Sequence, residues 1–255
     1  MYLQKVNAIS AFGVTGVLIA LLSGCGGNSS IGPGANTTSQ VRSINAQVCT
    51  TYNTVNFAQR TQTANIASGV AYGQITSYST VPSGNGINDF VVQNSTVVAQ
   101  NSYDLLPNGS YTLVATGDCS QGSASGVSPN ILQYTDSPPT AAQLSANAGL
   151  RVVHVAPATA SGYQVVDLYN TGLPLAGLTN VSYGGATGYA ILPAATYNLT
   201  LHSHANNNLL PLPTATTTAL SSLKLASGHS YTLFIIGTTS AVVNEGFDVK
   251  VIQDN

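Results

Sequence analysis

The stretch Tyr197-Asn198-Leu199-Thr200-Leu201-His202 alternates apolar and polar side chains. Successive side chains on a β-strand point to opposite faces, so this alternation predicts a strand that buries Tyr197, Leu199 and Leu201. Other short β-branched or aromatic runs, bounded by Gly, Pro, Asn or Ser, occur at Arg151–Val155, Val165–Tyr169, Tyr231–Ile236 and Asp248–Ile252. The sequence after residue 24 shows no convincing amphipathic helix. We therefore predict an all-β fold of antiparallel sandwiches.

The sequence also contains an internal repeat. Three segment pairs align in the same order: Val41–Asn45 with Leu150–His154, Val70–Pro82 with Val181–Pro193, and Gly109–Gly117 with Gly228–Gly237. Such order predicts a duplication, with domains at 41–136 and 150–255, each of about 100 residues and large enough for one core. The intervening linker, 137–149, contains Pro138 and Pro139, which favour extended backbone and a semi-rigid joint.

The N-terminal residues predict an export signal. Lys5 is followed by an apolar stretch, Ile9–Leu22, which is shorter than the roughly 20 residues that a membrane-spanning helix needs. The stretch ends in Leu22-Ser23-Gly24-Cys25, which resembles the lipobox of bacterial lipoproteins. That resemblance implies removal of a signal peptide, residues 1–24, and attachment of diacylglycerol to Cys25. An ordinary secretory signal that contains a cysteine is the alternative.

Residues 25–40 predict a flexible tether after the lipidated cysteine, because they carry little apolar surface and no charge. The residue after Cys25 is Gly26 rather than Asp. By resemblance to lipoproteins of bacteria with two membranes, this implies a lipid-anchored protein of the outer membrane, facing the periplasm or the cell surface. Several acyl chains would make such an anchor effectively permanent.

Charged residues are scarce in this chain and make up 5% of it, against about 25% in typical soluble domains. Without residues 1–24, five basic residues stand against eight acidic ones, a net charge of −3. Backbone binding to nucleic acid needs clustered Lys and Arg, so nucleic acid is not expected as a partner. Adsorption to anionic membranes is disfavoured for the same reason.

The second copy resembles a known family, DUF4397. The residues that carry the resemblance are Leu150–Pro157, Val166–Tyr169, Val181–Gly184, Leu192–Ala195 and Gly228–Thr232. The resemblance implies an Ig-like β-domain of bacterial envelope proteins, with no assigned reaction. Where the family has an acidic residue after Pro157, this chain has Ala158-Thr159-Ala160. The first copy departs further, with Asn45 at the position of His154 and Asn56 near that of Asp167.

The cysteines that remain after lipidation of Cys25 are Cys49 and Cys119. An even pair in an oxidising compartment predicts a disulfide. Such a bridge would close a loop of about 70 residues and constrain the unfolded chain by roughly 4 kcal/mol. Two free thiols are the alternative.

Two groups of polar residues are candidates for chemistry. His202 and His204 share a strand face and could bind a metal if His229 supplied a third ligand, but solvent-facing histidines are the favoured interpretation. His154 and Asp167 could orient a base for a nucleophile. No Gly-x-Ser-x-Gly turn supplies that nucleophile, so a buried polar contact is favoured. We therefore expect no metal site and no cofactor.

Tyrosine is the main aromatic residue, with 13 copies and no tryptophan. Tyr72 and Tyr78 recur in the second copy as Tyr183 and Tyr189. Tyr183 and Tyr189 are candidates for a surface that stacks on sugars or peptides, and core packing with the hydroxyl reaching water or backbone is the favoured interpretation.

The expected function is that of a non-enzymatic, membrane-anchored structural or binding module, serving adhesion, envelope scaffolding or matrix association. Its partners would be envelope proteins, peptidoglycan or polysaccharide. A glycan-binding accessory protein that uses the repeated tyrosines is the first alternative. A hydrolase that uses His154 and Asp167 is the second.

Overall fold

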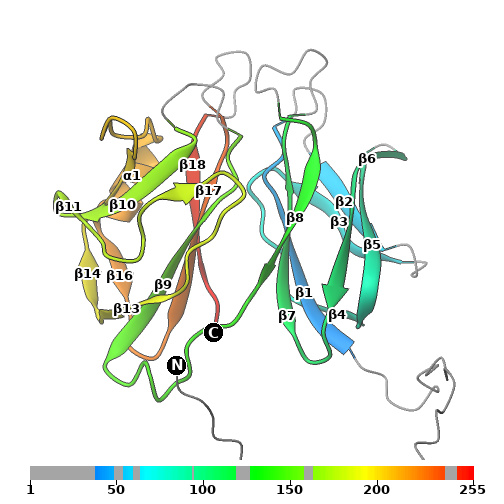
Figure 1. The fold of residues 1–255 in the computed structure, drawn as a ribbon, viewed down its shortest axis with the longest axis horizontal. Coiled ribbons are helices and arrows are strands. Elements are labelled where there is room, and N and C mark those ends of the chain that lie inside the picture. Colours follow the sequence, from blue (N-terminus) through cyan, green and yellow to red (C-terminus); the bar gives the residue numbers. More distant parts are fainter. Residues whose placement is uncertain are drawn as a thin grey trace, which may run out of the picture. The chain divides into compact units, whose positions relative to one another are not determined.

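The computed structural model describes residues 38–48, 54–59, 64–93, 95–118, 127–157, 163–238 and 246–255. Within these ranges the chain is almost entirely β-structure (Figure 1). The elements are β1 (Thr38–Asn45), β2 (Thr54–Gln59), β3 (Asn65–Ala71), β4 (Ser79–Pro82), β5 (Gly84–Gln93), β6 (Thr96–Leu105), β7 (Ser110–Thr116), β8 (Asn130–Thr135), β9 (Asn147–His154), β10 (Val165–Asn170), β11 (Leu173–Pro174), β12 (Val181–Ser182), β13 (Ala190–Pro193), β14 (Ala195–Tyr197), β15 (Leu199–Ser203), α1 (Thr214–Ser221), β16 (Leu223–Leu225), β17 (Ser230–Ile236) and β18 (Asp248–Gln253). The all-β prediction is confirmed.

Strands β1 to β8 form the first sandwich, which has two sheets. One sheet has the strand order β4-β1-β7-β8, and the other has the order β3-β2-β5-β6. Their apolar faces meet in one core, in which Phe57 and Val91 of one sheet pack with Val41 and Leu113 of the other. These four side chains are fully buried, so the two sheets stabilise each other by excluding water from the space between them.

Strands β9 to β18 form the second sandwich on a related plan. One of its sheets has the order β13-β9-β17-β18, which matches β4-β1-β7-β8 strand for strand. The facing sheet contains β10, β11, β12 and β15, and β14 pairs with β16. Arg151 lies opposite Thr232 in the pair of β9 with β17, as Arg42 lies opposite Thr112 in the pair of β1 with β7. The repeat seen in the sequence is therefore a repeat of structure.

The strand pairing differs from the prediction in one respect. All strand pairs in the described ranges are antiparallel except β1 with β7 and β9 with β17, which are parallel. A parallel pair requires a long crossover connection, and strands β2 to β6 and β10 to β16 provide it. Local periodicity does not encode this direction.

The alternating stretch from Tyr197 to His202 is interrupted rather than continuous. Strand β14 ends at Tyr197, Asn198 donates its backbone N–H to Asn170 Oδ1 at 3.1 Å, and β15 begins at Leu199. The predicted apolar face is confirmed, because Tyr197, Leu199 and Leu201 are buried. Helix α1 was not predicted. Its only buried residue is Leu220, so it has no apolar stripe that a periodicity analysis could detect.

The segment Thr37–Asn255 forms one compact unit, distinct from residues 1–36. The signal peptide, residues 1–24, and the tether up to residue 37 lie outside the described residues. The domain limits 41–136 and 150–255 stay predictions, and strand β9 begins at Asn147, inside the predicted linker. Among the described residues, none of the helices has the length and apolar character needed to cross a membrane.

Candidate functional site at the junction of the sandwiches

Each sandwich carries the same four polar side chains on or next to the sheet that contains its parallel strand pair. In the first, Arg42 Nε donates to Thr112 Oγ1 at 2.8 Å, and Thr112 Oγ1 donates to Asp136 Oδ2 at 2.6 Å. Tyr78 completes the set. Its hydroxyl donates to the same Asp136 oxygen at 2.8 Å, and its ring lies 4.9 Å from the Arg42 guanidinium carbon.

The second sandwich repeats this arrangement with Arg151, Thr232, Asp254 and Tyr189. Arg151 Nε donates to Thr232 Oγ1 at 2.6 Å, and Thr232 Oγ1 donates to Asp254 Oδ2 at 2.6 Å. Tyr189 donates to Asp254 Oδ2 at 2.8 Å and lies 4.9 Å from the Arg151 guanidinium carbon. We call the eight residues together the junction network.

The two closest ion pairs of the junction network run between the sandwiches, and a third, between Arg42 Nη2 and Asp136 Oδ1 at 3.5 Å, lies within the first sandwich. Arg42 Nη2 lies 2.6 Å from Asp254 Oδ1, and Arg151 Nη2 pairs with Asp136 Oδ1. Each arginine of one sandwich thus neutralises the terminal aspartate of the other. Their side chains are at most 5% exposed. Charges buried to this degree require a paired and hydrogen-bonded partner, which each sandwich obtains from the other.

An apolar cluster continues the junction. It includes Ile44 and Val114 of the first sandwich and Val153 and Phe234 of the second, all fully buried. Two hydrogen bonds also cross the junction: Thr116 Oγ1 donates to the Val155 carbonyl at 2.6 Å, and the Tyr134 hydroxyl donates to the Gly184 carbonyl at 3.1 Å. The contact surface is therefore built like a protein interior.

Electrostatics keep three members of the junction network, Arg42, Tyr78 and Tyr189, in one protonation state. Burial by itself would lower the pKa of Arg42, but the charges of Asp136 and Asp254 and the hydrogen bond to Asp254 raise it above its ordinary value. Burial, reinforced by Asp136, raises the pKa of Tyr78 well above its ordinary value, and burial does the same for Tyr189. The arginine stays charged and both tyrosines keep their protons, so they remain donors to the carboxylates.

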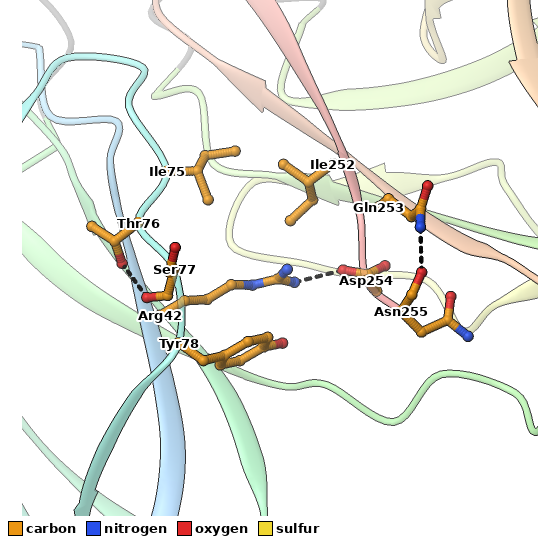
Figure 2. A pocket seen from close by; sticks show the side chains of 9 residues that line it. All are labelled: Arg42, Ile75, Thr76, Ser77, Tyr78, Ile252, Gln253, Asp254 and Asn255. Carbon is orange, nitrogen blue, oxygen red and sulfur yellow. Dashed lines mark hydrogen bonds and ion pairs between the residues drawn. The ribbon is translucent and has the colours of Figure 1, made fainter.

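A cleft of about 500 Å³ opens beside the network. One wall is the segment 75–78 of the first sandwich, the other is the segment 252–255 of the second, and Arg42 lies between them (Figure 2). The apolar part of its lining is Ile75 and Ile252, and the remaining lining side chains are polar. This cleft is the best-defined candidate binding site of the described chain.

The comparisons with known proteins identify the family. A family model described as Domain of unknown function (DUF4397) matches residues 39–161 and residues 150–255. The chain belongs to the DUF4397 family. No curated protein matches the sequence. Arg42 and Asp136 lie in the first matched segment alone, Asp254 lies in the second alone, and Arg151 lies where the two overlap.

Several predicted sites of this DUF4397 chain lie outside the described residues. They are the lipidation site Cys25, the lipobox residues Leu22, Ser23 and Gly24, and the cysteine pair Cys49 and Cys119. All of these sites stay predictions.

The recurring tyrosines of this DUF4397 chain lie at the junction. Tyr189 is a member of the network, and the Tyr183 hydroxyl lies 3.4 Å from Thr116 Oγ1 of the first sandwich. Both tyrosines are half-buried. Their hydroxyls already have protein partners, which favours the packing interpretation over a sugar-stacking surface.

His154 and Asp167, which the sequence grouped together, are not hydrogen-bonded to each other within the described part of the chain. His154 Nε2 donates to the Tyr163 carbonyl at 3.0 Å, whereas Asp167 pairs with His204 Nδ1 at 3.0 Å and accepts the Asn180 N–H at 2.6 Å. His154 and Asp167 therefore have different partners. The described residues contain no cluster of three His, Cys, Asp or Glu side chains that could hold a metal.

Sequence reasoning missed the junction network. The internal alignment pairs Arg42 with Arg151, but it assigns no partner to either arginine and gives Asp136 no role. A signal was available, because a chain with 5% charged residues places an arginine in the same position of both copies. An acidic residue, Asp136 or Asp254, also follows the last strand of each copy.

Proposed function

We propose that this DUF4397 chain is a non-catalytic module of the cell envelope in which the two sandwiches act as one rigid spacer and binding unit. The observation that carries the proposal is the exchange of buried ion pairs between the sandwiches, Arg42 with Asp254 and Arg151 with Asp136. The apolar cluster beside it would be exposed if the sandwiches separated. A spacer needs this resistance to hinge motion, whereas a joint with few contacts would leave the sandwiches free to move.

The rigidity is tested with a charge exchange in the full chain. Arg42→Asp alone places a new carboxylate beside those of Asp254 and Asp136 and should give the two sandwiches different rotational correlation times by NMR relaxation. Arg42→Asp combined with Asp254→Arg restores opposite charges and should bring the two times back together. Lys224→Ala, at an exposed position in β16, is the matched control. Equal times in all variants would contradict the role of the network.

The binding role is tested with the soluble compact unit, Thr37–Asn255. The fragment should be retained on whole cells, peptidoglycan or extracellular polysaccharide, the surfaces that an adhesion or scaffolding module would contact. Retention on none of these would count against the proposal. We further propose that the chain has no enzymatic activity, so a panel of esters, amides and glycosides should show no turnover that His154→Ala abolishes.

The proposed location is the outer membrane, with the chain anchored by lipid on Cys25. The lipobox Leu22-Ser23-Gly24-Cys25 supports this proposal. Cells fed radiolabelled palmitate should incorporate label into the wild-type protein and none into Cys25→Ser. If neither protein incorporates label, the lipid anchor is wrong. The proposal of a rigid unit held by the junction network does not depend on this result.

Two finer features belong to the same proposal: an Ig-like character of the sandwiches and a disulfide between Cys49 and Cys119. The bridge is supported by the pairing of the residues just before the two cysteines, because Val48 forms a parallel β-bridge with Asp118 and donates its N–H to the Gly117 carbonyl at 2.9 Å. Non-reducing peptide mapping by mass spectrometry should find the linked pair, and two alkylated thiols would exclude it.

A further inference from the structure

The two arginines of the junction network are not equally satisfied. Arg151 uses all three of its nitrogens: Nε donates to Thr232, Nη2 pairs with Asp136, and Nη1 donates to the backbone carbonyl of Thr135 at 3.0 Å. Arg42 repeats the first two contacts, with Thr112 and Asp254, and its Nη2 also lies 3.5 Å from Asp136 Oδ1. For Arg42 Nη1 there is no partner among the described residues. The pseudo-symmetry of the junction is therefore broken at one donor.

Arg42, whose Nη1 donor has no partner among the described residues, lines the cleft. Arg42 is 4% exposed and lines the cleft together with segments 75–78 and 252–255. Figure 2 shows its guanidinium reaching toward Asp254, with Ile75 and Ile252 flanking the same space. Nη1 is not one of the buried polar atoms that lack a partner, so it stays accessible from the cleft and can donate a charge-assisted hydrogen bond to an acceptor that enters it.

The charges of the network favour a neutral acceptor. Two arginines and two aspartates already balance one another across the junction, so an added anion would bring an uncompensated negative charge to a half-enclosed site. The equivalent nitrogen of Arg151 is satisfied by a backbone carbonyl. At the equivalent position of the second sandwich, the group that accepts a hydrogen bond from arginine Nη1 is thus a peptide carbonyl.

We propose that the cleft binds a short, neutral, extended peptide segment whose backbone carbonyl accepts a hydrogen bond from Arg42 Nη1. Ile75 and Ile252 provide apolar contact for small side chains of the peptide. The exposed side chains Ser77, Gln253 and Asn255 at the cleft provide a polar rim. This binding does not require the lipid anchor or the spacer role, so it stands or falls independently of the proposed function.

The test is an NMR titration of the full soluble unit, Thr37–Asn255, observed at the arginine side-chain nitrogens. The probe is the capped dipeptide N-acetyl-Ala-Ala-N-methylamide, with N-acetylglucosamine and glucose titrated in parallel. The peptide should shift the Arg42 signals saturably and leave those of Arg151 in place. A response to N-acetylglucosamine or glucose without one to the peptide would overturn the peptide assignment, and no response to any probe would overturn the site.

The duplication supplies a matched pair of variants. Ser77→Trp fills the cleft, and Gly188→Trp adds the same side chain at the equivalent position of the second sandwich, where an added Cβ meets no atom within 4 Å. Ser77→Trp should weaken peptide binding by at least about tenfold, whereas Gly188→Trp should leave it within about twofold. Equal weakening by both variants would contradict binding in the cleft. Unchanged thermal unfolding of both variants shows that the fold is intact.

Discussion

Asn45 and His154 occupy equivalent positions of the two sandwiches, yet they are held differently. Asn45 Nδ2 donates to the Val70 carbonyl at 3.0 Å, and its Oδ1 accepts the Gln47 N–H at 3.1 Å. His154 donates from Nε2 to the Tyr163 carbonyl, while its buried Nδ1 has no partner among the described residues. The Arg, Thr, Tyr and Asp of the junction network, by contrast, are the same in both copies.

The difference shows which parts of the duplicated unit are held constant. A side chain that the other sandwich needs, such as Arg42 or Asp254, cannot change without stranding a buried charge in its partner. A side chain that serves only its own sandwich, such as Asn45 or His154, is free to differ. The facing sheets also differ between the copies, since β5 and β6 of the first sandwich have ten residues each, whereas β15 of the second has five and is accompanied by the short strands β14 and β16 and by helix α1.

The largest effect is expected from removing Asp136. This carboxylate pairs with Arg151, lies 3.5 Å from Arg42 and accepts from Thr112 and Tyr78. Asp136→Ala should lower the free energy of unfolding by about 3–5 kcal/mol, since it leaves a buried cation uncompensated. Urea unfolding measures this. Asp254→Ala should cost less, because Asp254 pairs with Arg42 alone, and the reverse order would contradict the asymmetry of the network.

A second effect depends on pH and arises from His154. Burial lowers the pKa of His154 to about 4 from its usual 6.5, against a small opposing contribution from its hydrogen bond to Tyr163. The unfolded chain therefore binds a proton that the folded chain rejects between these values. The free energy of unfolding is undiminished above pH 6.5 and falls by about 3 kcal/mol as the pH drops to 4.

His154→Asn, which copies the residue of the first sandwich, isolates this contribution. Urea unfolding at pH 7.5 and at pH 4.5 should show a smaller loss of stability for the variant than for the wild type. The carboxylates titrate in both proteins, so the difference between them belongs to His154. A loss of equal size in both would show that His154 is not the group responsible.

Removing the threonine hydroxyls of the junction network should have a smaller effect, similar in size in the two sandwiches. Thr112 and Thr232 each accept from an arginine Nε and donate to an aspartate. Thr112→Val and Thr232→Val keep the shape of the side chain but remove the hydroxyl. The arginine Nε and the aspartate each lose a hydrogen bond, so each variant should lower the free energy of unfolding by about 1–3 kcal/mol. Thermal unfolding compares the two variants. Strongly unequal losses would mean that the two relays are not equivalent.

The smallest effect is expected at Asp167. Its Oδ1 accepts the Asn180 N–H as Asn56 Oδ1 accepts the Gly69 N–H in the first sandwich, at 2.6 and 2.7 Å. Asp167→Asn keeps this bond and loses only the carboxylate contact with His204, whose side chain is 50% exposed. Half-exposed pairs contribute little, so the unfolding free energy should change by less than about 1 kcal/mol. A loss of unfolding free energy as large as that of Asp136→Ala would show that the Asp167 carboxylate is important for stability.

The all-β class and the duplication were predictable from the sequence, because both follow from local patterns. Alternation between Tyr197 and His202 requires only that side chains on a strand point to opposite faces, and repeated segments such as Val70–Pro82 need no knowledge of contacts. The parallel pairing of β1 with β7 and the interruption at Asn198 were not predictable, since both depend on the path of the chain through the sheet.

What the tertiary structure alone decided is the pairing of charges. Arg42 finds Asp254 across 212 positions of sequence, and Arg151 finds Asp136 across 15. The sequence shows that each copy contains an arginine and an aspartate at equivalent positions. It does not show whether each arginine pairs with the aspartate of its own copy or with that of the other. The choice follows from docking two apolar sheet faces, Ile44 and Val114 against Val153 and Phe234, which brings the opposite charges of different copies into hydrogen-bonding distance.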